Sequence, residues 1–251
     1  MRMKRRYAVL LALTAAGALV LSGIAMAASS SSFSFEFSPV KVPKKKYKGG
    51  SLSTDLRTSY TTPTDPVERT QIYLDKNFKI NPKEAKKCSP SQLSSKTMAQ
   101  AMSVCKKALV GKGTAEAQAG FGTVKACVLL FNGQPQNKKP TLNVLTRAQA
   151  TPNSQISCAN PGSNNQGNVT VLLKGVVKDA SGKYGKVLDV DRITQASPFP
   201  LTIFKTKIDK DKYFSARCKA ANKTWNMQVT WTYKSGAKNT KQQTQKCKVK
   251  R

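Results

Sequence analysis

The chain has 251 residues, with 43 Lys and Arg against 12 Asp and Glu, and a formal net charge of +31. It contains no His, which excludes a Ser-His-Asp triad, a Cys-His pair and any His-ligated metal site. Hydrophobic residues make up 39% of the chain, enough to bury a core, so we expect a globular protein rather than a disordered one.

The first 27 residues have the pattern of a secretory signal peptide. Basic residues precede an apolar stretch over residues 8–21, and an A-x-A cleavage site follows at residues 25–27. An uncleaved membrane anchor is the alternative, because residues 8–28 have about the length that spans a bilayer. The small residues at the cleavage site favour cleavage, which leaves residues 28–251 as a single secreted domain.

Strands are predicted from the start of the mature chain. Phe33, Phe35 and Phe37 alternate with polar residues, which is the period-2 pattern of a strand buried on one face. We expect one short helix further on, where apolar residues recur at helical spacing over residues 98–109. Either Ser94 or Ser95 can cap its N-terminus.

Alternating patterns return in the second half of the chain, over residues 142–146, 169–177, 188–190 and 214–218. The clearest lies at residues 225–233, where Trp, Met, Val, Trp and Tyr share one face and polar residues share the other. Turn-forming residues separate these segments. We therefore expect a mainly β fold, an antiparallel β-sandwich of roughly 10–12 strands with one short helix.

The six cysteines all lie in the mature chain, and none belongs to a C-x-x-C motif. In an exported protein an even number of Cys indicates disulfides, here three, with 15 possible connectivities. We expect disulfides to cross-link the fold, each joining two cysteines that are nearest neighbours in the sequence. A metal site is the rival interpretation, but the chain offers no His and no closely spaced Cys. The expected pairs are Cys88 with Cys105, Cys127 with Cys158, and Cys218 with Cys247.

The positive charge is the main clue to function. Lys246, Lys248 and Lys250 alternate with Cys247 and Val249, so in a strand their ammonium groups would line one face. A surface this basic attracts polyanions by long-range steering and counterion release. The alternative is that dispersed lysines only keep the fold soluble. The candidate polyanion-binding residues are Lys44, Lys45, Lys46, Lys246, Lys248, Lys250 and Arg251.

The expected partners follow from the kind of cation present. Lys outnumbers Arg, which favours point-charge attraction over the bidentate recognition of phosphates or bases. We expect an anionic cell-wall polymer, an acidic polysaccharide or a membrane surface, and no sequence-specific nucleic acid. No cofactor and no metal are predicted.

A catalytic site is not expected, although two features need weighing. Asp189 and Asp191 are two residues apart in a predicted strand, so both carboxylates would leave the same face. Such a pair is a candidate glycosidase dyad or cation site, while the ordinary interpretation is a solvated strand edge. The aromatic residues within 225–233 would stack on sugar rings if exposed, but the Met and Val between them indicate a core.

Four segments carry a resemblance to a known group: the leader with residues 29–35, residues 105–117, the turn at 131–133, and the closing region 217–247. They resemble secreted β-rich proteins of high-GC Gram-positive bacteria, the actinobacteria. That group brings no activity or cofactor with it. The sequence thus predicts a secreted or envelope-associated, non-catalytic binding protein for anionic polymers; the alternatives are a carboxylate-dependent extracellular hydrolase and a structural or adhesive envelope component.

Overall fold

The computed structural model describes residues 30–60, 65–120, 122–148, 158, 169–197, 199–219 and 223–250. The expected leader and Arg251 lie outside the described residues. Strands dominate the described part, with eleven longer strands and four of three residues each. The strands of the first half are β1 (Ser30–Ser38), β2 (Lys41–Pro43), β3 (Lys48–Ser59), β4 (Val67–Asp75), β5 (Phe78–Ile80), β6 (Leu109–Ala119) and β7 (Gly122–Asn132). Those of the second half are β8 (Thr141–Ala148), β9 (Val169–Asp179), β10 (Tyr184–Val190), β11 (Leu201–Ile208), β12 (Phe214–Ala216), β13 (Thr224–Tyr233), β14 (Lys238–Lys246) and β15 (Lys248–Lys250). The helices are α1 (Pro90–Leu93), α2 (Met98–Cys105) and α3 (Ile193–Ala196), with 3-10 turns at Pro82–Glu84 and Lys106–Ala108.

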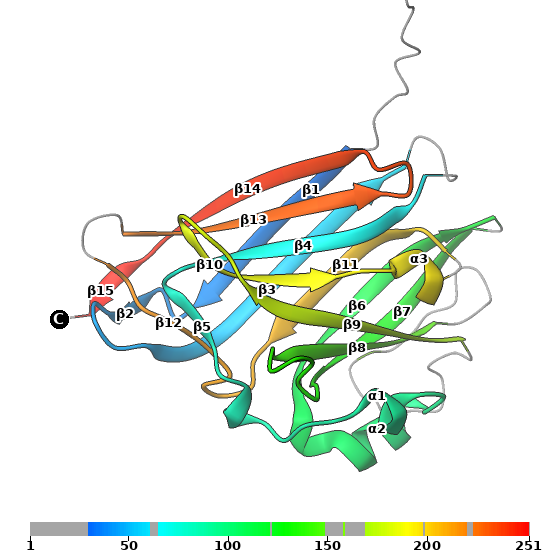
Figure 1. Ribbon diagram of the computed structural model, residues 1–251, viewed down its shortest axis with the longest axis horizontal. Coiled ribbons are helices and arrows are strands. Elements are labelled where there is room, and N and C mark those ends of the chain that lie inside the picture. The colour runs from blue at the N-terminus through cyan, green and yellow to red at the C-terminus, as the bar shows by residue number, and fades with distance from the viewer. Residues whose placement is uncertain are drawn as a thin grey trace, which may run out of the picture.

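Thirteen strands form one antiparallel sheet, which confirms the mainly β prediction. Its order is β14-β13-β4-β10-β9-β8-β7-β6-β11-β3-β12-β5, and β1 pairs with β3 beside this path. The sheet curls over, so that β13, β4 and β10 lie across β1, β3 and β11 (Figure 1). The two layers of the expected sandwich are therefore two halves of one continuous sheet.

Side chains close the seam where β1 and β14, the two edges of the curled sheet, come together. The amide of Gln245 on β14 accepts a hydrogen bond from the Phe37 backbone N–H (2.7 Å) and donates one to the Phe37 carbonyl (3.0 Å). At the other end of β1, the hydroxyls of Ser31 and Tyr233 are 2.9 Å apart. The two bonds from Gln245 occupy backbone groups of Phe37 that an open strand edge would leave unpaired.

The core lies inside the curl, on the inward faces of the strands. Phe37, Trp225, Met227 and Val229 are fully buried, and Trp231 is 2% exposed. The face of β13 that the sequence assigns to a core is thus buried along its whole length. Alternation alone placed these residues correctly because one side of the strand packs and the other meets water.

The helical segment covers the outer face of β7 and β8, where a second apolar cluster includes Leu93, Met98 and Leu129. The expected caps are wrong: Thr97, not Ser94 or Ser95, caps α2. Its Oγ1 accepts a hydrogen bond from the Gln100 backbone N–H (3.1 Å), and Gln100 Oε1 accepts one from the Thr97 N–H (3.0 Å). Ser95 has a left-handed φ of 58°, which interrupts the helical backbone between α1 and α2.

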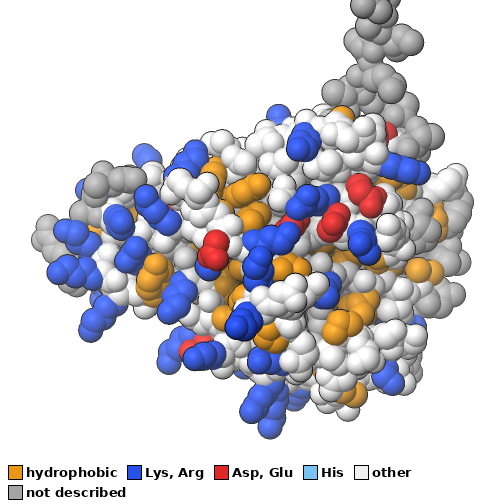
Figure 2. All heavy atoms as spheres, in the orientation of Figure 1, with side chains coloured by type: hydrophobic (Ala, Val, Ile, Leu, Met, Phe, Trp, Pro, Cys, Tyr) orange, Lys and Arg blue, Asp and Glu red, His pale blue; other side chains and the backbone are white. Residues whose placement is uncertain are grey.

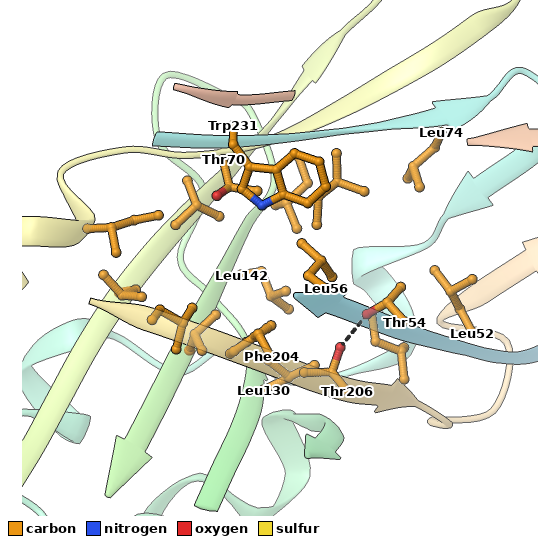
Figure 3. A pocket seen from close by; sticks show the side chains of 18 of the residues that line it. Leu52, Thr54, Leu56, Thr70, Leu74, Leu130, Leu142, Phe204, Thr206 and Trp231 are labelled. Atoms are coloured by element: carbon orange, nitrogen blue, oxygen red, sulfur yellow. Dashed lines mark hydrogen bonds between the residues drawn. The ribbon is translucent and has the colours of Figure 1, made fainter. Parts of the chain in front are cut away.

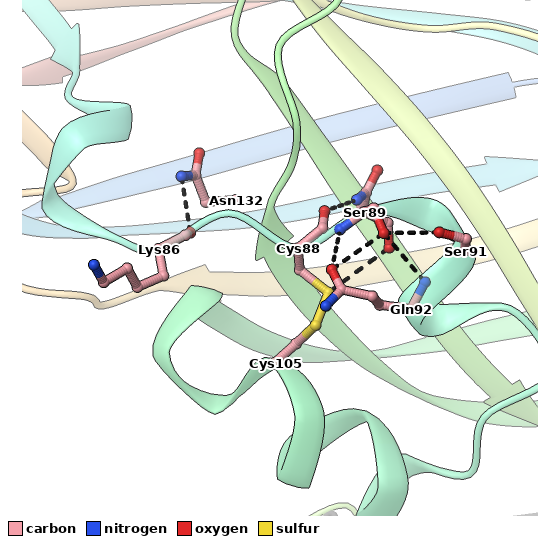
Figure 4. The surroundings of a disulfide bond; sticks show 8 residues. Lys86, Cys88, Ser89, Ser91, Gln92, Cys105 and Asn132 are labelled. Carbon is pink, nitrogen blue, oxygen red and sulfur yellow. Dashed lines mark hydrogen bonds between the residues drawn. A yellow bond between two sulfur atoms is a disulfide. The ribbon is translucent and has the colours of Figure 1, made fainter.

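Three disulfides join the cysteines in the expected pairs. Their Cα atoms are 5.7 Å apart in Cys88–Cys105, 5.4 Å in Cys127–Cys158 and 5.9 Å in Cys218–Cys247. Figure 4 shows the first of them, which ties α2 to the segment before α1. Three disulfides are typical of a protein that matures in an oxidising compartment outside the cytosol.

Candidate functional site

The two lysine groups singled out in the sequence meet at one end of the molecule. β2 and β15 pair in parallel, with Lys248 opposite Lys41 and Lys250 opposite Pro43. The run 44–46 follows β2 directly, and Lys246 ends β14 immediately before β15. Segments from the beginning and the end of the described chain thus become neighbours beside the C-terminus (Figure 1).

Covalent and backbone contacts hold this pair of short strands in place. The disulfide between Cys218 and Cys247 lies next to the strand pair. The Cys218 N–H donates to the carbonyl of Pro43 (3.0 Å), and the Cys247 N–H donates to the carbonyl of Lys223 (2.7 Å). Each half of the disulfide is therefore also anchored through its backbone.

We call the lysines around this strand pair the basic end. All ten are exposed, while Cys247 between them is buried and Val249 half-buried, as the alternating pattern predicts. Among the described residues none of the ten forms an ion pair. Figure 2 shows basic and no acidic side chains at the left end of the face in view, where β2 and β15 lie in Figure 1. The basic end comprises Lys41, Lys44, Lys45, Lys46, Lys48, Lys219, Lys223, Lys246, Lys248 and Lys250.

Four members of the basic end were not among the candidates from the sequence: Lys41, Lys48, Lys219 and Lys223. Lys41 and Lys48 flank the run 44–46, whereas Lys219 and Lys223 belong to no run of lysines. The position of Lys219 next to Cys218 was an available signal, because a disulfide from Cys218 to Cys247 places it near the C-terminal lysines.

An aromatic residue extends this surface toward β5 and β12. Tyr47, 37% exposed, has two cations near its ring: Lys79 Nζ is 5.8 Å from the ring centre and Arg217 Cζ is 5.0 Å from it. Cations over an aromatic face are attracted by the ring quadrupole. Tyr47 therefore holds Lys79 and Arg217 beside the basic end.

The two carboxylates of the alternative site, Asp189 and Asp191, have different surroundings. Asp189 lies on β10, and its 3% exposed carboxylate binds Arg69, at 2.6 Å, and Lys178. Burial raises the pKa of Asp189, but the hydrogen bonds from Arg69 and Lys178 outweigh it and hold the pKa below its ordinary value. An ionised, doubly paired carboxylate is unsuited to act as a general acid.

Asp191 lies beyond the last residue of β10, Val190, so strand alternation no longer governs its direction. Its carboxylate is exposed and accepts a hydrogen bond from the Arg192 backbone N–H (2.9 Å). The aromatic residues of β13 are buried, which overturns the idea of an open sugar-stacking face. Within the ranges that the structure describes, no group of His, Cys, Asp or Glu is arranged to hold a metal ion.

Comparisons with known proteins add no identification. No family model, no curated protein and no solved structure matches the chain. None of the described helices is both long enough and apolar enough to cross a membrane. The resemblance to secreted actinobacterial proteins accordingly stays a prediction, and the functional argument depends on the basic end itself.

Proposed function

We propose that the protein is exported, loses its leader over residues 1–27, and binds an anionic polymer at the cell envelope through the basic end, without catalysing a reaction. The observation that carries the proposal is the parallel pairing of β2 with β15, which gathers lysines from both ends of the described chain. Lysines that only solubilise the fold would have no reason to converge.

The geometry of the strand pair suits a ligand with repeated charges. Neighbouring strands lie about 4.8 Å apart, and alternate residues of one strand are about 6.6 Å apart. Lys248 and Lys250 therefore form one row of charges, with Lys41 beside it. A single small anion would engage only part of such an array, whereas a polymer reaches several lysines at once and gains from the release of its counterions.

Repulsion within the basic end supports the same proposal. Like charges directly opposite each other destabilise a strand pair. Lys41 and Lys248 are such a pair, and no described carboxylate forms an ion pair with either of them. A bound polyanion removes this cost by supplying the missing negative charge.

Hydrogen exchange of the purified protein with and without heparin tests the location of the site. Heparin should slow exchange in peptides covering residues 40–48 and 245–250, and moderate salt should abolish the effect because exposed charges are screened. Equal protection over the whole surface, or none at low salt, would overturn the proposal.

A separate measurement tests export. The mature protein recovered from outside the cells should begin at Ala28 and contain no free thiol. Recovery with residues 8–24 still attached, or with titratable thiols, would contradict this part of the proposal and leave the binding result unaffected.

A further inference from the structure

The curled sheet encloses an apolar cavity of about 110 Å³ between its two halves. Figure 3 shows side chains from both halves pointing toward one another across it: Trp231, Thr70 and Leu74 on one side, and Leu56 and Phe204 on the other. Most of the remaining lining is aliphatic. The cavity lies near the centre of the fold, away from the outward-facing lysines.

Several core residues are only partly buried because they adjoin this cavity. Leu173, Leu188, Phe204 and Ile208 contact both of the apolar clusters inside the curl, yet each is only half-buried. Inward-facing side chains with packed neighbours on both sides retain exposed area when a void large enough for a probe adjoins them. The two clusters therefore stop short of filling the interior.

Four of the polar side chains in the lining hydrogen-bond to protein partners, among them Tyr213, whose hydroxyl donates to Asn132 Oδ1 (3.3 Å). The hydroxyls of Thr54 and Thr206 hydrogen-bond to each other (2.8 Å), as drawn in Figure 3. Thr202 donates to the carbonyl of Glu116 (3.1 Å). A buried water needs two to four polar partners, and an apolar cavity of about 150 Å³ stays dry and accepts benzene or xenon. This cavity thus favours a hydrocarbon group over water.

We propose that the cavity is a binding site for the hydrocarbon chain of a small amphiphile. It adjoins an open hollow of about 670 Å³, with which it shares Thr58, Thr202 and Ile203. Ser32, Tyr60 and other polar residues line that hollow, which therefore suits a polar head while the chain occupies the apolar interior. The site is separate from the basic end and does not depend on the proposed function.

Fluorescence quenching by 1-bromohexane tests the proposal, because bromine quenches a nearby indole. Trp231 lines the cavity, while Trp225, the other Trp of the chain, is packed among Phe37, Phe78 and other rings. We expect saturable quenching of part of the emission in the purified protein. Trp231→Phe should remove the quenched fraction, and dodecanoic acid should compete with the probe.

Two matched variants of β9 separate the cavity from the rest of the surface. Leu173 faces the cavity, and Leu172 faces the outer cluster. Leu173→Phe should weaken binding of the probe at least tenfold, while Leu172→Phe should leave it within twofold. If Leu173→Phe does not fold, Val177→Leu, a smaller addition to the same lining, should weaken binding severalfold.

Three results would overturn the proposal. One is no quenching in the folded parent protein. The second is quenching that persists unchanged in the folded cavity-filling variant, and the third is equal loss in the Leu172 and Leu173 variants.

Discussion

Replacing Lys246, Lys248 and Lys250 together by Gln is the sharpest test of the basic end. Gln keeps a polar side chain only one atom shorter than Lys, leaves the backbone hydrogen bonds of β15 in place, and removes three charges from the basic end. With a single-stranded polyanion each neutralised phosphate contributes about 0.7 to the slope of log K against log salt. If all three lysines contact the ligand, the slope should become shallower by about 2.

That change in slope sets the expected loss of affinity. Counterion release contributes nothing at 1 M salt, so over the tenfold range down to 0.1 M a slope difference of about 2 amounts to about a hundredfold. Fluorescence anisotropy of a labelled oligothymidylate at several salt concentrations measures both quantities. The oligonucleotide serves as a polyanion whose slope per phosphate is known, and no base preference is expected.

A charge-matched triple variant distinguishes the basic end from net charge. Lys83, Lys107 and Lys174 are exposed, stand outside the basic end, and form no described ion pair. Their replacement by Gln lowers the net charge equally and should cost less than threefold in affinity. Equal losses in the two triple variants would refute the reasoning, since binding would then follow total charge.

Three further predictions concern the framework. Replacing Cys218 and Cys247 by Ser should lower the free energy of unfolding by about 2–5 kcal/mol in urea titrations and weaken polyanion binding; unchanged binding would show that the disulfide does not support the basic end. Gln245→Ala should cost about 1–3 kcal/mol in the same titrations, because Phe37 loses both seam hydrogen bonds. Since the fold lowers the pKa of Asp189, its contribution is complete above about pH 4 and is lost as the pH falls through the folded value. Asp189→Asn should therefore lose less stability than the parent between about pH 5 and pH 2; an equal loss would contradict this.

Local patterns predicted the parts of the fold that depend on neighbours in sequence. The alternation over residues 225–233 gave both the strand and its buried face, because a two-residue period is fixed by strand geometry. The expected nearest-neighbour disulfides are confirmed, although the sequence alone does not choose among the 15 connectivities. Each bridge closes a short loop, since the paired cysteines are 17, 31 and 29 residues apart in the sequence.

Features that depend on the register between distant strands could not be predicted from the sequence. The ion pairs of Asp189 were not predicted, because its partners come from β4 and β9, diagonally across the ladders. No residue near Asp189 in the sequence indicates that Arg69 or Lys178 will pair with it. The cavity was hidden as well, since residues around a void and residues in a filled core have the same inward-facing pattern.

The pairing of β2 with β15 is the least expected contact from sequence, and its cost bears on its role. Each strand has three residues, too few for a ladder that overcomes the repulsion between Lys41 and Lys248 by itself. The Cys218–Cys247 disulfide supplies the constraint, which means that the fold holds like charges together instead of letting them separate. Added salt should therefore raise the melting temperature of the free protein, and a polyanion at a hundred times its Kd should add about 2.7 kcal/mol to stability. A melting temperature that falls with salt would mean that attraction elsewhere, and not this repulsion, dominates the electrostatics of the fold.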